Sequence, residues 1–193
     1  METQTMKFSE AADLSKEILK AVEKMGFTEM TPIQMKTLPL MMEGRDIIAL
    51  APTGTGKTCA FGIPMLEYVN LQDKRVQELV LAPTRELSLQ ITEELKQLSR
   101  FIPGVRIACL YGGQPIAKQL NQLKQNPQIV VATPGRLLDH LNRGNTAGLA
   151  IAVIGQDARD IMEKLRGIPC RGATSCPDQL SRAIEQYLNE QAK

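Results

Sequence analysis

The sequence carries at residues 51–58 the run Ala51-Pro52-Thr53-Gly54-Thr55-Gly56-Lys57-Thr58, which follows an apolar run at 46–50 and precedes an apolar segment. Glycines at this spacing let successive backbone N–H groups face one point, and a helix that starts there adds its dipole. Lys57 then places a cation on the β and γ phosphates, and the Thr58 hydroxyl can ligate Mg²⁺. The stretch predicts a nucleoside triphosphate site made of strand, loop and helix. Only the later half of the general P-loop pattern is met, because Ala51 stands where the first glycine would be, so a plain glycine-rich turn is the alternative.

Apolar runs rich in β-branched residues recur at 46–50, 78–82, 105–110 and 128–132, and each is followed by a segment of helical length. A further segment, 13–25, spaces its apolar residues as one face of a helix. Strand, turn and helix in repeated alternation predict an α/β fold, with a mostly parallel sheet covered by helices on both faces. Ligands of such folds bind beyond the carboxyl ends of the strands.

Length and composition limit what the chain holds. Its 193 residues, 43% hydrophobic and 23% charged, suit one well-cored domain with a small appendage. The formal net charge of +2 predicts that a bound anion is held by local geometry and not by a strongly basic surface. No apolar run approaches the roughly 20 residues of a membrane helix, and residues 1–7 lack the apolar core of a signal peptide. We therefore expect a cytoplasmic protein that binds no membrane and keeps its cysteines reduced.

The run at 51–58 resembles motif I of DEAD-box RNA helicases, and residues 26–34 support the resemblance. Their sequence, Gly-Phe-Thr-Glu-Met-Thr-Pro-Ile-Gln, is similar to the Q motif of that family, and Phe8 stands where its upstream aromatic is expected. The Gln34 carboxamide offers a donor and an acceptor to the adenine edge, and Phe27 can stack on the base, which favours ATP over GTP. The alternative is that Phe27 belongs to the core and Gln34 to a helix surface.

The resemblance implies a RecA-like P-loop NTPase fold with ATP and Mg²⁺ as cofactors. The nucleotide site that it implies consists of Phe27, Pro32, Gln34, Ala51, Pro52, Thr53, Gly54, Thr55, Gly56, Lys57 and Thr58.

Three further motifs follow the later apolar runs: Pro83-Thr84-Arg85, Gly112-Gly113 and Thr133-Pro134-Gly135-Arg136. They are similar to motif Ia, the paired glycines and motif Ib of DEAD-box proteins, which grip the sugar-phosphate backbone of RNA. Arginines, threonine hydroxyls and helix N-termini all suit phosphate oxygens. We therefore expect these residues to bind single-stranded or structured RNA without reading its bases. A plainer interpretation exists for each motif alone, such as a Thr-Pro pair that only caps a helix.

The DEAD-box resemblance covers residues 7–145 and predicts an incomplete first RecA-like domain over residues 1–145. The family next has an Asp-Glu-Ala-Asp string, a Ser-Ala-Thr string and a second RecA-like domain with arginine fingers, and neither string occurs here. The run at 149–154 can fill the missing strand, which places Asp157 and Ala158 where the acidic motif belongs. Under that alignment Asp157 helps to hold Mg²⁺, but Ala158 replaces the carboxylate that polarises the attacking water.

A second resemblance covers residues 146–193. The stretch from Gly155 to Leu180, with Thr-Ser-Cys-Pro-Asp at 174–178, is similar to the end of the TSCPD domain found near the C-termini of some ribonucleotide reductases. This interpretation predicts a fused, short, α-rich appendage of one strand and two helices, and it makes the position of Asp157 a coincidence. Cys170 and Cys176 are then buried thiols, or remnants of a metal or thiol-exchange site.

The expected function is that of the ATP-binding and RNA-binding domain of an ATP-dependent RNA helicase, not competent for unwinding by itself. Lys57 and Thr58 are its catalytic residues, and the catalytic Glu is absent. Two alternatives stay open: a non-catalytic module that binds RNA or a partner, and an inactive product of fusion or truncation.

Overall fold

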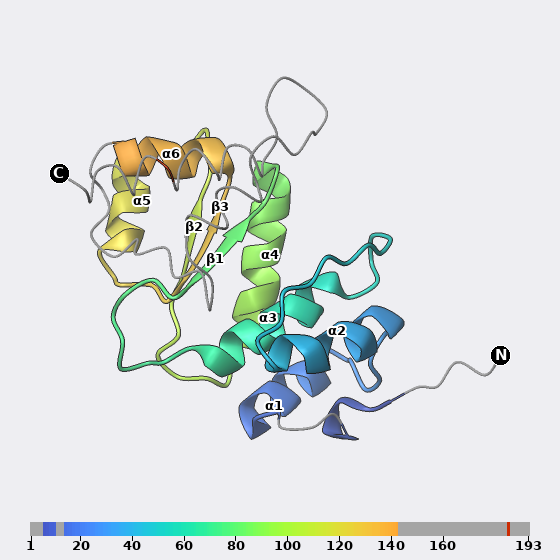
Figure 1. The fold of residues 1–193 in the computed structure, drawn as a ribbon. Helices are drawn as coiled ribbons and strands as arrows, with labels where there is room; N and C mark the ends of the chain where they lie inside the picture. Colours follow the sequence, from blue (N-terminus) through green and yellow to red (C-terminus); the bar gives the residue numbers. More distant parts are fainter. Residues whose placement is uncertain (1–5, 11–13, 143–184, 186–193) are drawn as a thin grey trace. The chain divides into compact units, whose positions relative to one another are not determined.

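The computed structural model describes residues 6–10, 14–142 and 185 (Figure 1). The chain divides into two compact units, which we call the helical unit (residues 1–71 and 91–105) and the sheet unit (residues 72–90 and 106–193). Except for Glu185, the TSCPD-like segment 146–193 lies outside the described residues, together with the strand expected at 149–154 and Asp157, Cys170 and Cys176. No helix in the described part of the chain is long and apolar enough to span a membrane.

The helical unit contains the 3-10 helix η1 (Phe8–Glu10), α1 (Lys16–Lys24), α2 (Pro32–Met42), α3 (Lys57–Tyr68) and the later turns of α4 (Arg85–Leu98). α1 confirms the helix expected at 13–25. The Ser15 hydroxyl caps it by accepting from the Ile18 amide at 3.3 Å. α3 lies close to α4, since a Cβ added to Gly62 would meet Leu95 Cδ2 at 2.7 Å. The core of this unit is apolar and includes Phe8, Ile18, Val22, Leu38, Ile63, Leu66, Leu95 and Leu98.

The first of the four expected strands is not formed. Residues 46–50 are not in a strand, and the side chains of Ile48 and Leu50 are 98% and 95% exposed. β propensity is realised where a neighbouring strand satisfies the backbone and buries the side chains, and no strand of the described residues pairs with this run. The prediction of a strand before the phosphate loop is therefore wrong, whereas the predicted loop and the helix after it are present.

The sheet unit is built on β1 (Glu78–Leu81), β2 (Ile107–Leu110) and β3 (Ile129–Ala132), which confirm the other three expected strands. They form a parallel sheet in the order β1-β3-β2, with Ile129 of β3 opposite both Glu78 and Ile107. Because the strands are parallel, the residues that follow them meet at one edge of the sheet. These are the residues in which the sequence places its RNA-binding motifs.

Helices cover both faces of this sheet, as the sequence predicts. On one face, α5 (Ile116–Leu123) and α6 (Pro134–Asn142) pack on alternate strand residues (Figure 1). On the other face, Cys109 Sγ lies 3.6 Å from the Ser88 carbonyl oxygen of α4. The core on the α5 and α6 face contains Leu79, Leu81, Ala108, Leu110, Leu123, Val130, Ala132 and Leu137. Burying each of the larger side chains contributes about 1.5–3 kcal/mol.

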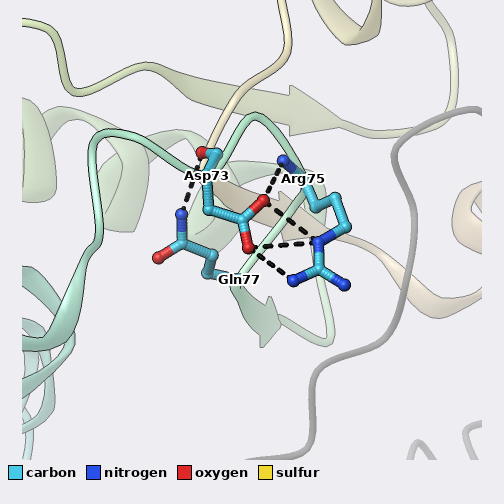
Figure 2. Close-up of polar contacts among 3 residues, drawn as sticks. All are labelled: Asp73, Arg75 and Gln77. Atoms are coloured by element: carbon cyan, nitrogen blue, oxygen red, sulfur yellow. Dashed lines mark hydrogen bonds and ion pairs between the residues drawn. The ribbon is translucent and has the colours of Figure 1, made fainter.

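A salt-bridged turn leads the chain into β1 (Figure 2). The Asp73 carboxylate accepts from Arg75 Nη2 at 2.6 Å and from the Arg75 amide at 2.9 Å, and these bonds lower its pKa to about 2. Gln77 Nε2 donates to the Asp73 carbonyl oxygen at 3.2 Å. The Gln77 amide then donates to the Gln128 carbonyl oxygen at 2.8 Å, so the turn aligns β1 with β3.

Candidate functional site

Residues 51–58 form a tight loop that leads directly into α3. Gly54 and Gly56 have left-handed backbones, with φ of 81° and 80°, a conformation that a side chain would strain. Apart from Gly54 and its two chain neighbours, no heavy atom of the described residues lies within 4 Å of a Cβ built on Gly54, so the loop is open there. Gly56 caps α3, and its carbonyl oxygen accepts from the Ala60 amide at 3.1 Å. The loop thus has the backbone form of an anion cradle at a helix N-terminus.

The Lys57 ammonium lies over this loop. Its Nζ donates to the Ala51 carbonyl oxygen at 2.7 Å and to the Pro52 carbonyl oxygen at 2.5 Å. The Thr55 hydroxyl donates to the same Pro52 oxygen at 2.8 Å, which fixes the turn. Neutral carbonyls leave the ammonium charge uncompensated, so it can pair with an anion that enters the loop.

Gln34 connects the loop to the start of α2. Its Oε1 accepts from the Thr31 amide at 2.8 Å in a capping box, and its Nε2 donates to the Gly56 carbonyl oxygen at 3.1 Å. The side chain is 3% exposed, whereas Phe27 is 41% exposed. The alternative that placed Phe27 in the core and Gln34 on the surface is therefore wrong. A carboxamide has two donor hydrogens and two acceptor positions, so Gln34 keeps one of each for a base.

Thr58, the second residue of α3, is the candidate ligand for Mg²⁺. A single hydroxyl suits an ion that is held by phosphates and retains most of its waters. No group of three or more His, Cys, Asp or Glu in the described part of the chain is arranged to hold a metal ion. Cys59 follows Thr58, and burial together with the nearby Glu94 raises its pKa to about 11, which favours the thiol over the thiolate.

Arg85, an exposed arginine of the sheet unit, stands at the junction of β1 and α4. Pro83 and Thr84 precede it and are also exposed. The Thr84 hydroxyl accepts from the Leu87 amide at 3.2 Å, so it caps α4, as its plainer interpretation supposes. The Arg85 guanidinium lies over the Tyr111 ring, 5.0 Å from its centroid, in a cation–π contact.

Gly112 and Gly113 form an exposed loop next to Arg85. Gly113 has φ of 84°, and a Cβ there would stand 3.4 Å from Arg85 Nη1. Thr133, which follows β3, donates its amide to the Leu110 carbonyl oxygen at 2.8 Å, and its own carbonyl oxygen accepts from Leu137 at 3.0 Å. The structure therefore brings Arg85 and the loop together at the carboxyl edge of the sheet.

Arg136 is oriented differently from Arg85, because only 11% of its side chain is exposed. Its Nη1 donates to the Gln114 carbonyl oxygen at 2.8 Å and to Gln119 Oε1 at 3.3 Å. Its Nε lies 3.6 Å from Asp139 Oδ2. Pro134 is buried and Gly135 is exposed, so part of this motif supports the loop rather than facing solvent.

Sequence reasoning missed three residues of this site: Tyr111, Gln119 and His140. Gln119 and His140 are fully buried, and His140 Nε2 lies 3.0 Å from Gln119 Oε1. Gln119 stands between Ile116 and Leu123 on the apolar side of α5, where a polar residue is unusual. That anomaly was the available signal.

Comparison with known proteins identifies the family of the chain. Residues 31–166 match the family model described as DEAD/DEAH box helicase. The ATP-dependent RNA helicase CshA of Listeria monocytogenes is 55% identical over 198 residues, which cover 95% of this chain and 38% of that protein. The DEAD-box ATP-dependent RNA helicase CshA of Bacillus subtilis is 50% identical over 193 residues, covering 92% of this chain and 39% of that protein.

A solved structure shows the same fold. The DEAD box protein from the hyperthermophile Methanococcus jannaschii matches with a TM-score of 0.68 and 43% identity, over 72% of this chain and 38% of that one. The chain spans about two fifths of the length of the curated relatives that it matches. Its sheet and helices are those of a RecA-like domain, and the chain belongs to the DEAD/DEAH box helicase family.

Proposed function

We propose that this chain is the ATP-binding and RNA-binding domain of an ATP-dependent RNA helicase, and that its 193 residues do not unwind RNA by themselves. The observation that carries the proposal is the glycine loop at residues 51–58, which is open at Gly54, with the Lys57 ammonium over it and Gln34 against Gly56. The relatives named as ATP-dependent RNA helicases support the first part of the proposal, binding of ATP and RNA.

The helical unit supplies the nucleotide half of this function. Backbone N–H groups of the loop and the Lys57 ammonium bind the phosphates, and Thr58 contributes a hydroxyl to Mg²⁺. The exposed ring of Phe27 stacks on adenine, while the spare donor and acceptor of Gln34 select it. Bound ATP would supply the γ-phosphoryl group for hydrolysis in a complete helicase, and Mg²⁺ would neutralise charge on the phosphates.

The sheet unit supplies the RNA half. Arg85 offers a cation to a phosphate, and the Gly112–Gly113 loop lets the sugar-phosphate backbone approach closely. Pro83, Thr84, Thr133 and Gly135 stand at the same edge of the sheet. These groups contact no base edge, so the binding they provide is independent of RNA sequence.

Unwinding needs groups that the sequence does not contain. No Asp-Glu-Ala-Asp or Ser-Ala-Thr string follows β3, and Ala158 stands in the place of the catalytic carboxylate under the alignment above. Under that alignment the carboxylate that would polarise the attacking water is missing from these 193 residues.

The nucleotide half is tested by titrating the purified chain with a fluorescent ADP. Lys57→Ala removes a charge-assisted contact and should weaken binding by about tenfold or more. Lys20→Ala, an exposed lysine on α1, serves as the matched control and should leave the affinity unchanged.

The absence of unwinding by these 193 residues is tested by strand displacement from a short RNA duplex and by ATPase assays. We expect neither unwinding nor RNA-stimulated hydrolysis. Robust RNA-stimulated ATPase activity that Lys57→Ala abolishes would contradict the proposal.

One observation favours the alternative of a non-catalytic RNA-binding module. All nine candidate RNA residues lie in the sheet unit, and all the candidate nucleotide residues lie in the helical unit. RNA affinity measured with and without Mg-ADP separates the two functions, because the module binds RNA equally in both conditions.

A further inference from the structure

Gln119 is a fully buried polar residue in the middle of α5. Its Nε2 donates to the Tyr111 carbonyl oxygen at 2.8 Å. Its Oε1 accepts from Arg136 Nη1 at 3.3 Å and lies 3.0 Å from His140 Nε2. One carboxamide thus connects the end of β2 with two residues of α6.

The chemistry of its partners determines how this carboxamide is oriented. A carbonyl oxygen only accepts and a guanidinium only donates, so the amino group must face Tyr111 and the oxygen must face Arg136. His140 Nε2 faces the same oxygen and must therefore carry a hydrogen. Each contact is compatible with the other two, so the network has one arrangement.

The network holds both ends of the Gly112–Gly113 loop. Gln119 fixes the loop at Tyr111, and Arg136 fixes it at Gln114, whose carbonyl oxygen accepts from Nη1 at 2.8 Å. The Tyr111 ring in turn makes the cation–π contact with the Arg85 guanidinium. The positions of the Arg85 side chain and of the loop therefore depend on the buried Gln119 carboxamide and on the Arg136 guanidinium.

We propose that Gln119 is a positioning residue for RNA binding, which sets the geometry of the Gly112–Gly113 loop and of Arg136 without touching RNA. The inference rests on the proposed RNA-binding function of this edge of the sheet. Beyond that function, the buried Gln119 carboxamide determines where the RNA-facing loop and Arg136 lie. Losing the amide leaves the loop free to move away from Arg85, and RNA must then order it on binding.

The test compares Gln119→Met with Gln122→Met. Gln122 lies on the same helix and also bonds the backbone of β2, with its Oε1 3.3 Å from the Cys109 amide, but it is not part of the network. Affinity for a fluorescein-labelled single-stranded oligouridylate is measured by anisotropy, and affinity for fluorescent ADP is the control. We expect Gln119→Met to weaken RNA binding about tenfold, with ADP affinity unchanged, and Gln122→Met to change neither.

A double-mutant cycle with Arg136→Ala distinguishes positioning from loss of stability. If Gln119 acts through Arg136, its effect on RNA affinity shrinks in the Arg136→Ala background, whereas losses that only reflect stability add. A second variant, Gln119→Glu, keeps an acceptor for Arg136 and His140 and loses the donor to Tyr111. We expect its RNA affinity to lie between those of the wild type and Gln119→Met.

The outcomes separate this inference from the function on which it rests. If Arg85→Ala and Arg136→Ala both leave RNA affinity unchanged, this edge does not bind RNA, and both proposals fail. If Arg136→Ala weakens RNA binding while neither Gln119 variant does, or if the effects add, the positioning role alone is overturned.

Discussion

Gly56 is the residue at which the phosphate loop and Gln34 meet. A Cβ on Gly56 would stand 2.3 Å from Gln34 Nε2, the atom that donates to the Gly56 carbonyl oxygen. Gln34 is buried and also caps α2 through Thr31, so it cannot move away without losing hydrogen bonds. Gly56 therefore has two roles: it allows the left-handed backbone of the loop, and it leaves room for the Gln34 side chain.

Replacing it should show both roles. Gly54→Ala and Gly56→Ala each place a side chain at φ near 80° and should each cost about 1–2 kcal/mol of unfolding free energy. Gly56→Ala should cost about 1 kcal/mol more, because it also breaks the Gln34 hydrogen bond. Urea denaturation followed by circular dichroism measures the difference. Equal losses for the two variants would show that Gln34 does not restrain the loop.

At the scale of the element, two leucines in runs of similar composition have opposite environments. Leu50 belongs to the expected strand at 46–50 and is 95% exposed, whereas Leu110 ends β2 and is fully buried. The same substitution at both sites therefore reports on strand formation. We expect Leu110→Ala to lower the unfolding free energy by about 2–5 kcal/mol and Leu50→Ala to change it by about 0.5 kcal/mol or less. A large loss for Leu50→Ala would mean that the run at 46–50 is buried in solution.

β1, an outer strand of the three-stranded sheet that the described residues form, carries a carboxyl group at its first residue, Glu78. Burial raises the pKa of Glu78 from 4.5 to about 7. Between these values the folded state holds a proton that the unfolded state has released, so stability should fall as pH rises from 4.5 to 7 and level off above 7.

Glu78→Gln tests this dependence, since an amide has no charge to bury. Melting temperatures of variant and wild type should agree near pH 4.5 and diverge by about pH 8, where the variant should be more stable by on the order of 2 kcal/mol. Glu23→Gln on α1 changes an exposed carboxylate and serves as the control. If the melting temperatures of Glu78→Gln and the wild type changed with pH in parallel, the prediction would be contradicted.

At the scale of the whole molecule, the net charge of +2 is consistent with the small number of cations at the sheet edge. Arg85 is exposed, and Arg136 is mostly occupied by the chain itself. On single-stranded nucleic acid each neutralised phosphate contributes about −0.7 to the slope of log K against log salt concentration.

RNA affinity should therefore depend weakly on salt, with a slope of about −1.4 or shallower if two phosphates are neutralised. Arg85→Ala should make the slope shallower by about 0.7. Arg75→Ala, in the same unit but paired with Asp73, should leave it unchanged. A much steeper slope in anisotropy titrations would indicate a basic surface that these arginines do not account for.

Much of this molecule was predictable because its signals are local. The run at 51–58 specifies a loop and a helix start through glycines that accept positive φ, and the structure has both. Three of the four apolar runs became strands, and the motifs that follow them meet at one edge, as parallel pairing requires. The DEAD-box resemblance rested on the same short strings, and the family match bears it out.

Only the tertiary structure decided which of these local preferences were realised. The run at 46–50 has the composition of a strand, but pairing depends on a neighbour that composition does not reveal. The sequence predicted that Arg136 binds phosphate, but in the structure its Nη1 donates to the Gln114 carbonyl oxygen and to Gln119 Oε1. The sequence by itself therefore determined the loop, the order of the elements and the family. Burial and the choice of hydrogen-bond partners were decided by residues distant in the chain, because those properties depend on what packs against a side chain.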